Sequence, residues 1–168
     1  MRVLVVTLCG IAVLLIAYSI VPTDEYRDSR QSGAVSSENT EAAPYNISIV
    51  IGNTAVPAEL NNTPWGEKVF DKLPIESDFE TWGNEIYFSI PVSLSSSDMV
   101  EEVSLGDIAY WPPGKAFCIF YGMTPVSTGG VIRPASAVIP LGKVIGDPTV
   151  FKELVQSART VRLEKAVE

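Results

Sequence analysis

The side chains best suited to chemistry in this chain are Arg133 and several aromatic rings. Arg133 lies in the loop sequence GGVIRPASA, where its guanidinium could donate a charged hydrogen bond to a ligand. One charged hydrogen bond contributes about 1.5 to 3 kcal/mol. Arg133 is therefore a candidate site residue; otherwise it is a solvated loop charge or pairs with a nearby carboxylate.

The aromatic side chains fall on neighbouring predicted strands, where they can fill a core or face outward. Tyr87 shares a strand face with Glu85, opposite to Ile86 and Phe88, so we expect it to point outward. An outward ring beside a guanidinium suits a groove for an apolar or proline-containing peptide. The candidate ligand-binding residues are Tyr87, Trp111, Phe117, Phe120, Tyr121 and Arg133.

The composition excludes several classes of site. The 168-residue chain has no histidine, which removes Ser-His-Asp and Cys-His catalysis and histidine-bound zinc. Two cysteines, Cys9 and Cys118, are too few for a metal site, and we predict no metal and no cofactor. A net charge of −8 without a basic cluster also argues against nucleic-acid binding.

The N-terminal part of the chain predicts export. Residues 3–21 are uncharged and nearly all apolar, long enough as a helix to span a bilayer. They predict a signal anchor or, if cleavage follows Ala17-Tyr18-Ser19, a signal peptide. Arg2 precedes the run and favours a domain on the extracytoplasmic side. The predicted division is therefore an anchor or signal at 1–21, a flexible tether at 22–45 and a folded domain at 46–168.

The domain from Asn46 onward is predicted to be mainly β. Seven or eight strands with two short helices favour a small closed or nearly closed β-barrel. Residues 116–122 are apolar on both faces, so other parts of the chain should cover both sides. Pro57 predicts an edge or a bulge for its strand. The predicted strands are 46–51, 54–60, 85–92, 107–111, 116–122, 136–146 and 160–167, and the predicted helices begin at Pro64 and Pro148.

Three stretches carry a resemblance to a known family: TWGNEIYFSIPV, GDIAYWPPGKAFCIFYGMTP and PASAVIPLGKV. Over residues 46–165 the chain resembles the small prokaryotic cyclophilin-like domain family, whose members are largely uncharacterised. This resemblance implies a cyclophilin-like β-barrel with a helix at each end. The Phe-His-Arg and Gln-Gly-Gly motifs of active cyclophilins do not occur in the sequence, so the resemblance does not bring their catalytic site with it.

These observations lead us to expect a membrane-tethered, extracytoplasmic cyclophilin-like domain that binds a peptide or small-molecule ligand without catalysis. Residues 3–21 would make the membrane contact, and no nucleic acid would be bound. One alternative, suggested by the resemblance to cyclophilins, is a slow peptidyl-prolyl cis-trans isomerase in which Arg133 is the catalytic residue and donates a hydrogen bond to the prolyl nitrogen. This reaction needs no nucleophile or proton shuttle, because its barrier of about 20 kcal/mol comes from amide resonance. The other alternative is a structural or interaction domain of a cell-envelope assembly.

Overall fold

The computed structural model describes residues 43–167. The predicted membrane segment at 3–21 and almost all of the predicted tether lie outside the described residues. Between residues 43 and 167, no helix is long and apolar enough to cross a membrane.

The described part of the chain is mainly β, as predicted, with nine strands, two short α-helices and two 3₁₀ turns. The predicted strands are all present, and β3 and β4 are added within the acidic segment that follows α1. The elements are β1 Tyr45–Ile51, β2 Thr54–Leu60, α1 Pro64–Phe70, β3 Ile75–Asp78, β4 Glu80–Thr81, β5 Glu85–Ser89, β6 Asp107–Trp111, the 3₁₀ turn Pro112–Gly114, β7 Ala116–Phe120, β8 Ile139–Val144, the 3₁₀ turn Pro148–Val150, α2 Phe151–Ser157 and β9 Thr160–Lys165.

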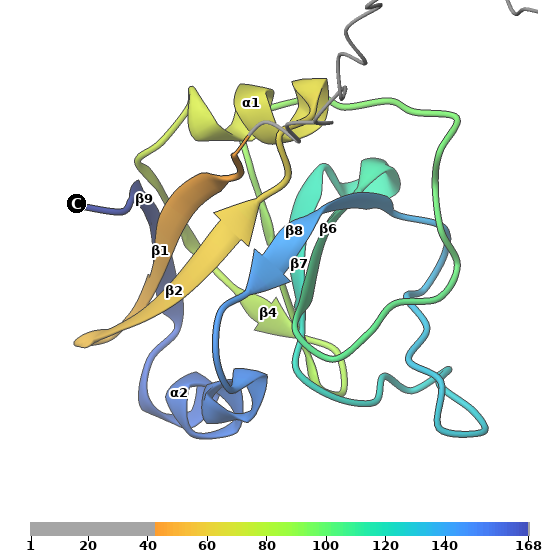
Figure 1. The fold of residues 1–168 in the computed structure, drawn as a ribbon. Helices are drawn as coiled ribbons and strands as arrows, with labels where there is room; N and C mark the ends of the chain where they lie inside the picture. The colour runs from red at the N-terminus through yellow and green to blue at the C-terminus, as the bar shows by residue number, and fades with distance from the viewer. Residues whose placement is uncertain (1–42, 168) are drawn as a thin grey trace, which may run out of the picture. The chain divides into compact units, whose positions relative to one another are not determined.

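The strands form one sheet in the order β3-β9-β1-β2-β8-β6-β7-β5-β4. Its two edge strands, β3 and β4, are consecutive in the chain and separated only by Phe79. The sheet must therefore curl until its edges meet, which produces a nearly closed barrel (Figure 1). Helices α1 and α2 lie toward opposite ends of this barrel (Figure 1), as the family resemblance implied.

The opening hairpin confirms one expectation and corrects another. β1 and β2, both predicted as strands, pair across a turn at Gly52-Asn53, where Gly52 has a φ of +60°. β2 is an interior strand between β1 and β8, so the predicted edge or bulge at Pro57 is wrong. The missing N–H is tolerated because the β2–β8 ladder covers only Ala58–Leu60. The carbonyl of Pro57 still accepts a hydrogen bond from Ile145 N at 2.8 Å.

The first helix begins at Pro64, as predicted, whereas the predicted second helix starts at Pro148 as a 3₁₀ turn and becomes α-helical only at Phe151. The side chain of Thr63 accepts a hydrogen bond from Gly66 N at 3.1 Å, ahead of α1. Asp147 accepts one from Thr149 N at 2.9 Å, ahead of the 3₁₀ turn that leads into α2. These caps satisfy backbone donors that have no partner within the first turn.

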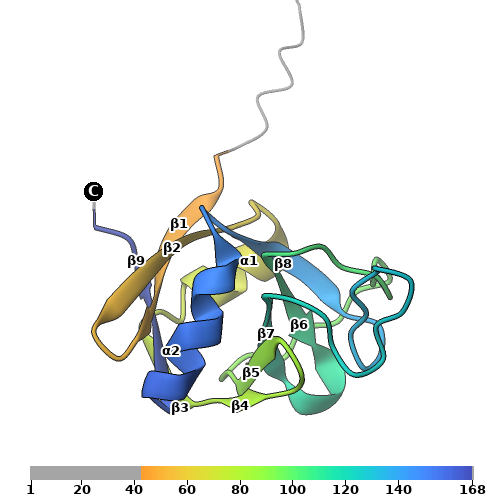
Figure 2. The ribbon, with the colours of Figure 1, turned by 90° about the horizontal axis from the view of Figure 1, so that it is seen from below.

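Strand β7 is buried on both faces, as predicted, and all five of its residues are inaccessible to water. Phe117 and Ile119 point into the barrel and join the main core. On the other side, Ala116, Cys118 and Phe120 join a second cluster outside the barrel, covered by residues including Ile132 and Val138. The long segment between β7 and β8, which lies beside β6 and β8 in Figure 2, supplies this cover.

The β2–β8 ladder joins the two halves of the sheet through three residue pairs, which makes Gly142 a critical position. A Cβ added at Gly142 would lie 2.0 Å from the carbonyl oxygen of Glu59 on β2. We expect Gly142→Ala to lower the free energy of unfolding by about 3 kcal/mol, because the strands must separate to admit the methyl group. Urea unfolding measures this difference.

The neighbouring Lys143→Ala is the matched control. Lys143 is exposed and its ammonium lies 3.2 Å from Glu59 Oε1, so its loss should cost less than about 1 kcal/mol. Equal stabilities for the two variants would show that the ladder does not require a glycine.

Candidate functional site

A cavity of about 190 Å³ lies on the outer side of the barrel wall. Glu85 and Tyr87 on β5 face it, because they alternate with Ile86 and Phe88, which belong to the barrel core. The cavity is lined by Trp82, Glu85, Tyr87, Trp111, Pro134, Ala135 and Val138.

The floor beside this cavity is built from small side chains. In the strand register, Tyr87 on β5 lies opposite Cys118 on β7, and Trp111 on β6 lies opposite Ala116. Cys118 also pairs with Ala109 on β6. Ala109, Ala116 and Cys118 have small side chains, so the rings of Tyr87 and Trp111 project beyond them. The result is a depression with a floor of small residues and aromatic sides.

Trp82 is positioned by the turn between β4 and β5. Its backbone N–H donates to Glu85 O at 2.9 Å, and the turn is tied to the chain after β7 by Asn84 N to Met123 O at 3.0 Å. Gly83 has a φ of +63°, and a Cβ there would lie 2.9 Å from the Met123 carbonyl oxygen. The tight turn therefore requires glycine and holds the Trp82 indole at the cavity.

The opposite wall comes from the segment between β7 and β8. The indole N–H of Trp111 donates to Ser136 Oγ at 2.8 Å. Val100 and Val138 exchange two backbone hydrogen bonds of 2.9 Å. These bonds fasten the wall both to a barrel strand and to the segment that follows β5, so the cavity is preformed.

Glu85 is the chemically distinctive residue of the cavity, since it is an acidic residue that is only 6% exposed. Burial raises the pKa of Glu85 from 4.5 to about 7, and the neighbouring Cys118 thiol partly opposes this rise. Burial also raises the pKa of the Cys118 thiol, so the thiol stays neutral, and its Sγ donates to Ala116 O at 3.9 Å. Within residues 43–167, the ion pairs of Lys and Arg involve Glu59, Glu102 and Glu164, not Glu85.

Of the predicted site residues, the structure brings Tyr87 and Trp111 together in the cavity wall. Phe117 and Tyr121 lie in the barrel core, and Phe120 lies in the outer cluster with no exposed surface. None of these three lines the cavity. Phe117 and Phe120 lie on β7 as predicted, but both faces of this strand are covered, and Tyr121 lies just beyond the end of the strand.

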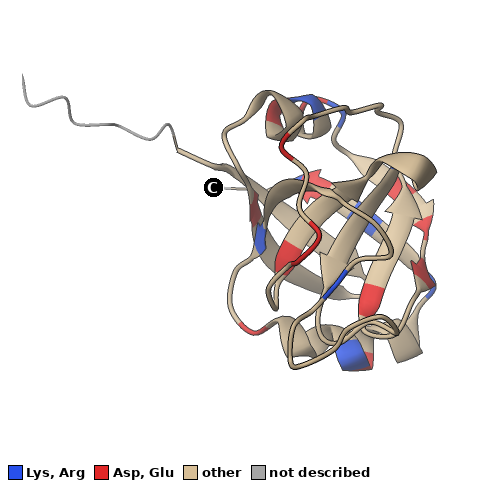
Figure 3. Ribbon diagram, turned by 90° about the vertical axis from the view of Figure 1, so that its right-hand side faces the viewer, with Lys and Arg blue, Asp and Glu red and all other residues tan. Residues whose placement is uncertain are grey.

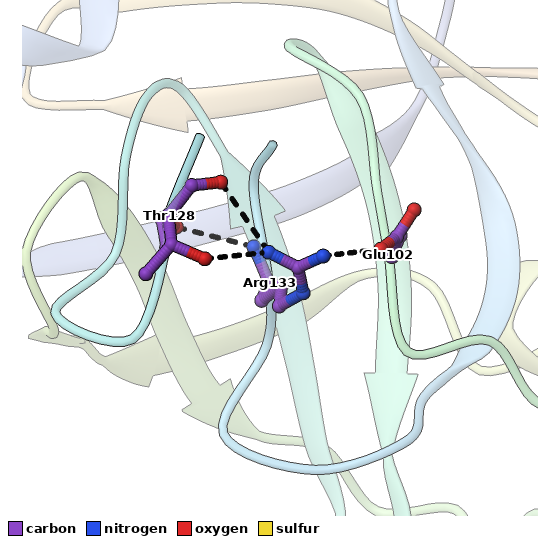
Figure 4. Close-up of polar contacts among 4 residues, drawn as sticks. Glu102, Thr128 and Arg133 are labelled. Atoms are coloured by element: carbon purple, nitrogen blue, oxygen red, sulfur yellow. Dashed lines mark hydrogen bonds and ion pairs between the residues drawn. The ribbon is translucent and has the colours of Figure 1, made fainter. Parts of the chain in front are cut away.

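Arg133 pairs with a carboxylate, which the sequence analysis gave as an alternative to a catalytic role (Figure 4). Its guanidinium forms an ion pair with Glu102 and donates to Thr128 Oγ1 at 3.0 Å. The Arg133 backbone N–H donates to Ser127 Oγ at 3.1 Å, and its carbonyl accepts from Thr124 Oγ1. Arg133 thus braces the loop that carries Pro134 and Ala135 but does not itself line the cavity.

In the view of Figure 3, Lys and Arg are dispersed among Asp and Glu and form no cluster that would indicate a second binding site. In the part of the chain that the structure describes, no group of three or more His, Cys, Asp or Glu side chains is placed to hold a metal ion.

Sequence reasoning missed Trp82, Pro134, Ala135 and Val138 as lining residues, and it placed Glu85 beside Tyr87 without assigning it a role. The alternation in EIYFS contained the signal for Glu85, since it puts this carboxyl on the face of Tyr87. The burial of Glu85 depends on a turn and a loop distant in the sequence, for which no local pattern exists.

The raised pKa of Glu85 predicts a pH-dependent stability. Below pH 4.5 the carboxyl is neutral in the folded and unfolded protein. Between pH 4.5 and about 7 the folded protein keeps a proton that the unfolded chain has released, so the free energy of unfolding falls as pH rises. Above pH 7 the free energy of unfolding is lower by about 3 kcal/mol than it is below pH 4.5. Glu85→Gln has no carboxyl to titrate at this position, so its stability relative to the wild type should increase between pH 4 and pH 8, as measured by urea unfolding.

The control is Glu80→Gln, which changes an exposed carboxyl on the adjacent β4 and should follow the wild-type pH profile. A Glu85→Gln profile parallel to that of the wild type would mean that Glu85 titrates normally in the folded protein.

Comparison with known proteins agrees with this architecture. A family model described as cyclophilin-like matches residues 45–164. The solution structure of a hypothetical protein from Archaeoglobus fulgidus is similar, with 32% sequence identity and a TM-score of 0.59, over 76% of this chain and 99% of that chain. No curated protein matches. The resemblance seen in the sequence is thus confirmed, and the chain belongs to the cyclophilin-like family.

Proposed function

We propose that the folded domain binds a peptide or small-molecule ligand in the cavity beside β5, without catalysis. We further propose that residues 3–21 anchor the protein in a membrane and that residues 22–45 tether the domain on the extracytoplasmic side. The observation that supports the binding proposal is the preformed cavity with Trp82, Tyr87 and Trp111 in its wall and Glu85 as its polar group. Mostly apolar walls with a single well-placed polar group are typical of ligand sites.

The groups near the cavity favour binding over catalysis. Among the lining residues, Glu85 alone carries a carboxyl, amino or imidazole group, so the cavity holds no second group of these kinds to complete an acid–base pair. The guanidinium of Arg133 is engaged by Glu102 and Thr128 and would have to leave both to reach a prolyl nitrogen. No observation therefore favours an isomerase that uses Arg133.

The binding proposal is tested on residues 43–168, because the archaeal relative consists almost entirely of this domain. The probes are blocked Ala-X-Pro-Phe tetrapeptides with X as Lys, Leu or Glu, and 3,3-dimethylbutan-1-ol as a small neutral molecule. We expect at least one probe to shift the indole N–H NMR signals of Trp82 and Trp111 and to leave that of Trp65 on α1 unchanged. The rate of prolyl isomerisation in the peptides should stay at its uncatalysed value.

The control variants are Ala135→Trp, which places a large ring at the cavity, and Ala55→Trp, which places one on exposed β2. Ala135→Trp should abolish the shifts and Ala55→Trp should not. Absence of any shift with every ligand tested would remove the binding proposal. Faster isomerisation that disappears in Arg133→Ala would replace it with the isomerase.

The tether is tested on the full-length protein. We expect it to stay in the membrane fraction after a carbonate wash and to keep its original N-terminus, because the apolar segment continues past the candidate cleavage position. An N-terminus that begins after Ser19, in the soluble fraction, would instead identify a cleaved signal peptide.

A further inference from the structure

We propose that the ligand group held in the cavity is a small organic cation, an ammonium group with or without methyl substituents, and that Glu85 is its counter-ion. This inference rests on the proposed function, because it names the chemical class of ligand for the same cavity.

The first argument is that the carboxyl of Glu85 lacks a cationic partner. A carboxylate this deeply buried is normally paired or strongly hydrogen-bonded. Its polar neighbour inside the protein is the neutral thiol of Cys118, a weak donor whose Sγ is directed to Ala116 O at 3.9 Å. Among the described residues, no Lys or Arg forms an ion pair with it. Since Glu85 faces the cavity, a cationic partner can reach it there.

The second argument is that the walls suit a cation. Trp82, Tyr87 and Trp111 come from three separate segments and line the same cavity as Glu85. The faces of aromatic rings carry partial negative charge and attract ammonium groups, most strongly where water is excluded. Three rings and one carboxylate therefore supply complementary charge to a cation and an apolar surface to its methyl or methylene groups.

The third argument is size. The cavity of about 190 Å³ is smaller than the roughly 300–1,000 Å³ of sites that enclose a whole drug-sized ligand. It fits a head group or one side-chain end, with the rest of the ligand outside.

The titration of Glu85 gives the proposal a characteristic pH dependence. A cation binds the ionised carboxyl, and with a pKa near 7 the ionised fraction rises about tenfold between pH 6 and pH 8. Cys118 on β7 is the titratable group in contact with Glu85, and it stays neutral over this range because burial raises its pKa. Affinity for a cation should therefore rise about tenfold, whereas affinity for a neutral molecule should not rise.

The test compares choline with 3,3-dimethylbutan-1-ol, which has the same shape but a carbon atom in place of the charged nitrogen. Both are titrated into residues 43–168 at pH 6, 7 and 8, and the indole signals of Trp82, Trp111 and Trp65 are followed by NMR. We expect choline to bind at least tenfold more tightly than the alcohol at pH 8, with the pH dependence above. Nα-acetyl-lysine methylamide is the third probe, and tighter binding than choline would identify a peptide as the source of the cation.

Glu85→Gln should remove the preference for choline and its pH dependence. A second variant, Trp111→Leu, should weaken choline binding while the pH dependence from Glu85 persists. The indole signal of Trp65 and a cooperative urea transition show that each variant is folded.

The outcomes separate this inference from the proposed function. Alcohol binding at pH 8 as tight as choline binding would overturn the cation proposal and leave ligand binding in place. Choline binding that is equal at pH 6 and pH 8, or unchanged in Glu85→Gln, would also overturn it. If neither these probes nor the peptides shift the Trp82 and Trp111 signals, both proposals fail.

Discussion

The burial of both faces of strand β7 is the constraint on which the rest of the domain depends. Its inner residues, Phe117 and Ile119, fill the barrel, so its outer residues must be shielded by something other than the barrel itself. The chain meets this need with the long segment between β7 and β8, which packs Ile132 and Val138 against Cys118 and its neighbours. The cavity lies at the margin of this cover, where the segment meets β5 and β6.

The same cover explains why an acid can sit on an outer strand face and still be buried. Glu85 would be solvated on an ordinary barrel surface, but here the turn carrying Trp82 and the wall at Val138 enclose it. Enclosure without a cation raises its pKa and disfavours its charged form. Such a group costs stability above neutral pH, and a ligand that supplies positive charge would offset that cost.

The contacts of Arg133 give it a structural role in the fold. A guanidinium in this loop suggested a catalytic donor, yet its hydrogen bonds to Thr128 and its ion pair with Glu102 make it a brace for the loop. The residues that it steadies, Pro134 and Ala135, are those that reach the cavity. Its contribution to the site is indirect, through the position of the wall.

The sequence alone predicted the barrel class, seven of the nine strands, the start of α1 and the outward direction of Tyr87, because these follow from local alternation and capping. It could not determine the position of Pro57 within the sheet, which depends on where β8 pairs. Nor could it show that Trp82, Glu85 and Trp111 share one cavity. Those facts arise from contacts between distant segments, and only the tertiary structure decides which solvent-facing positions become buried.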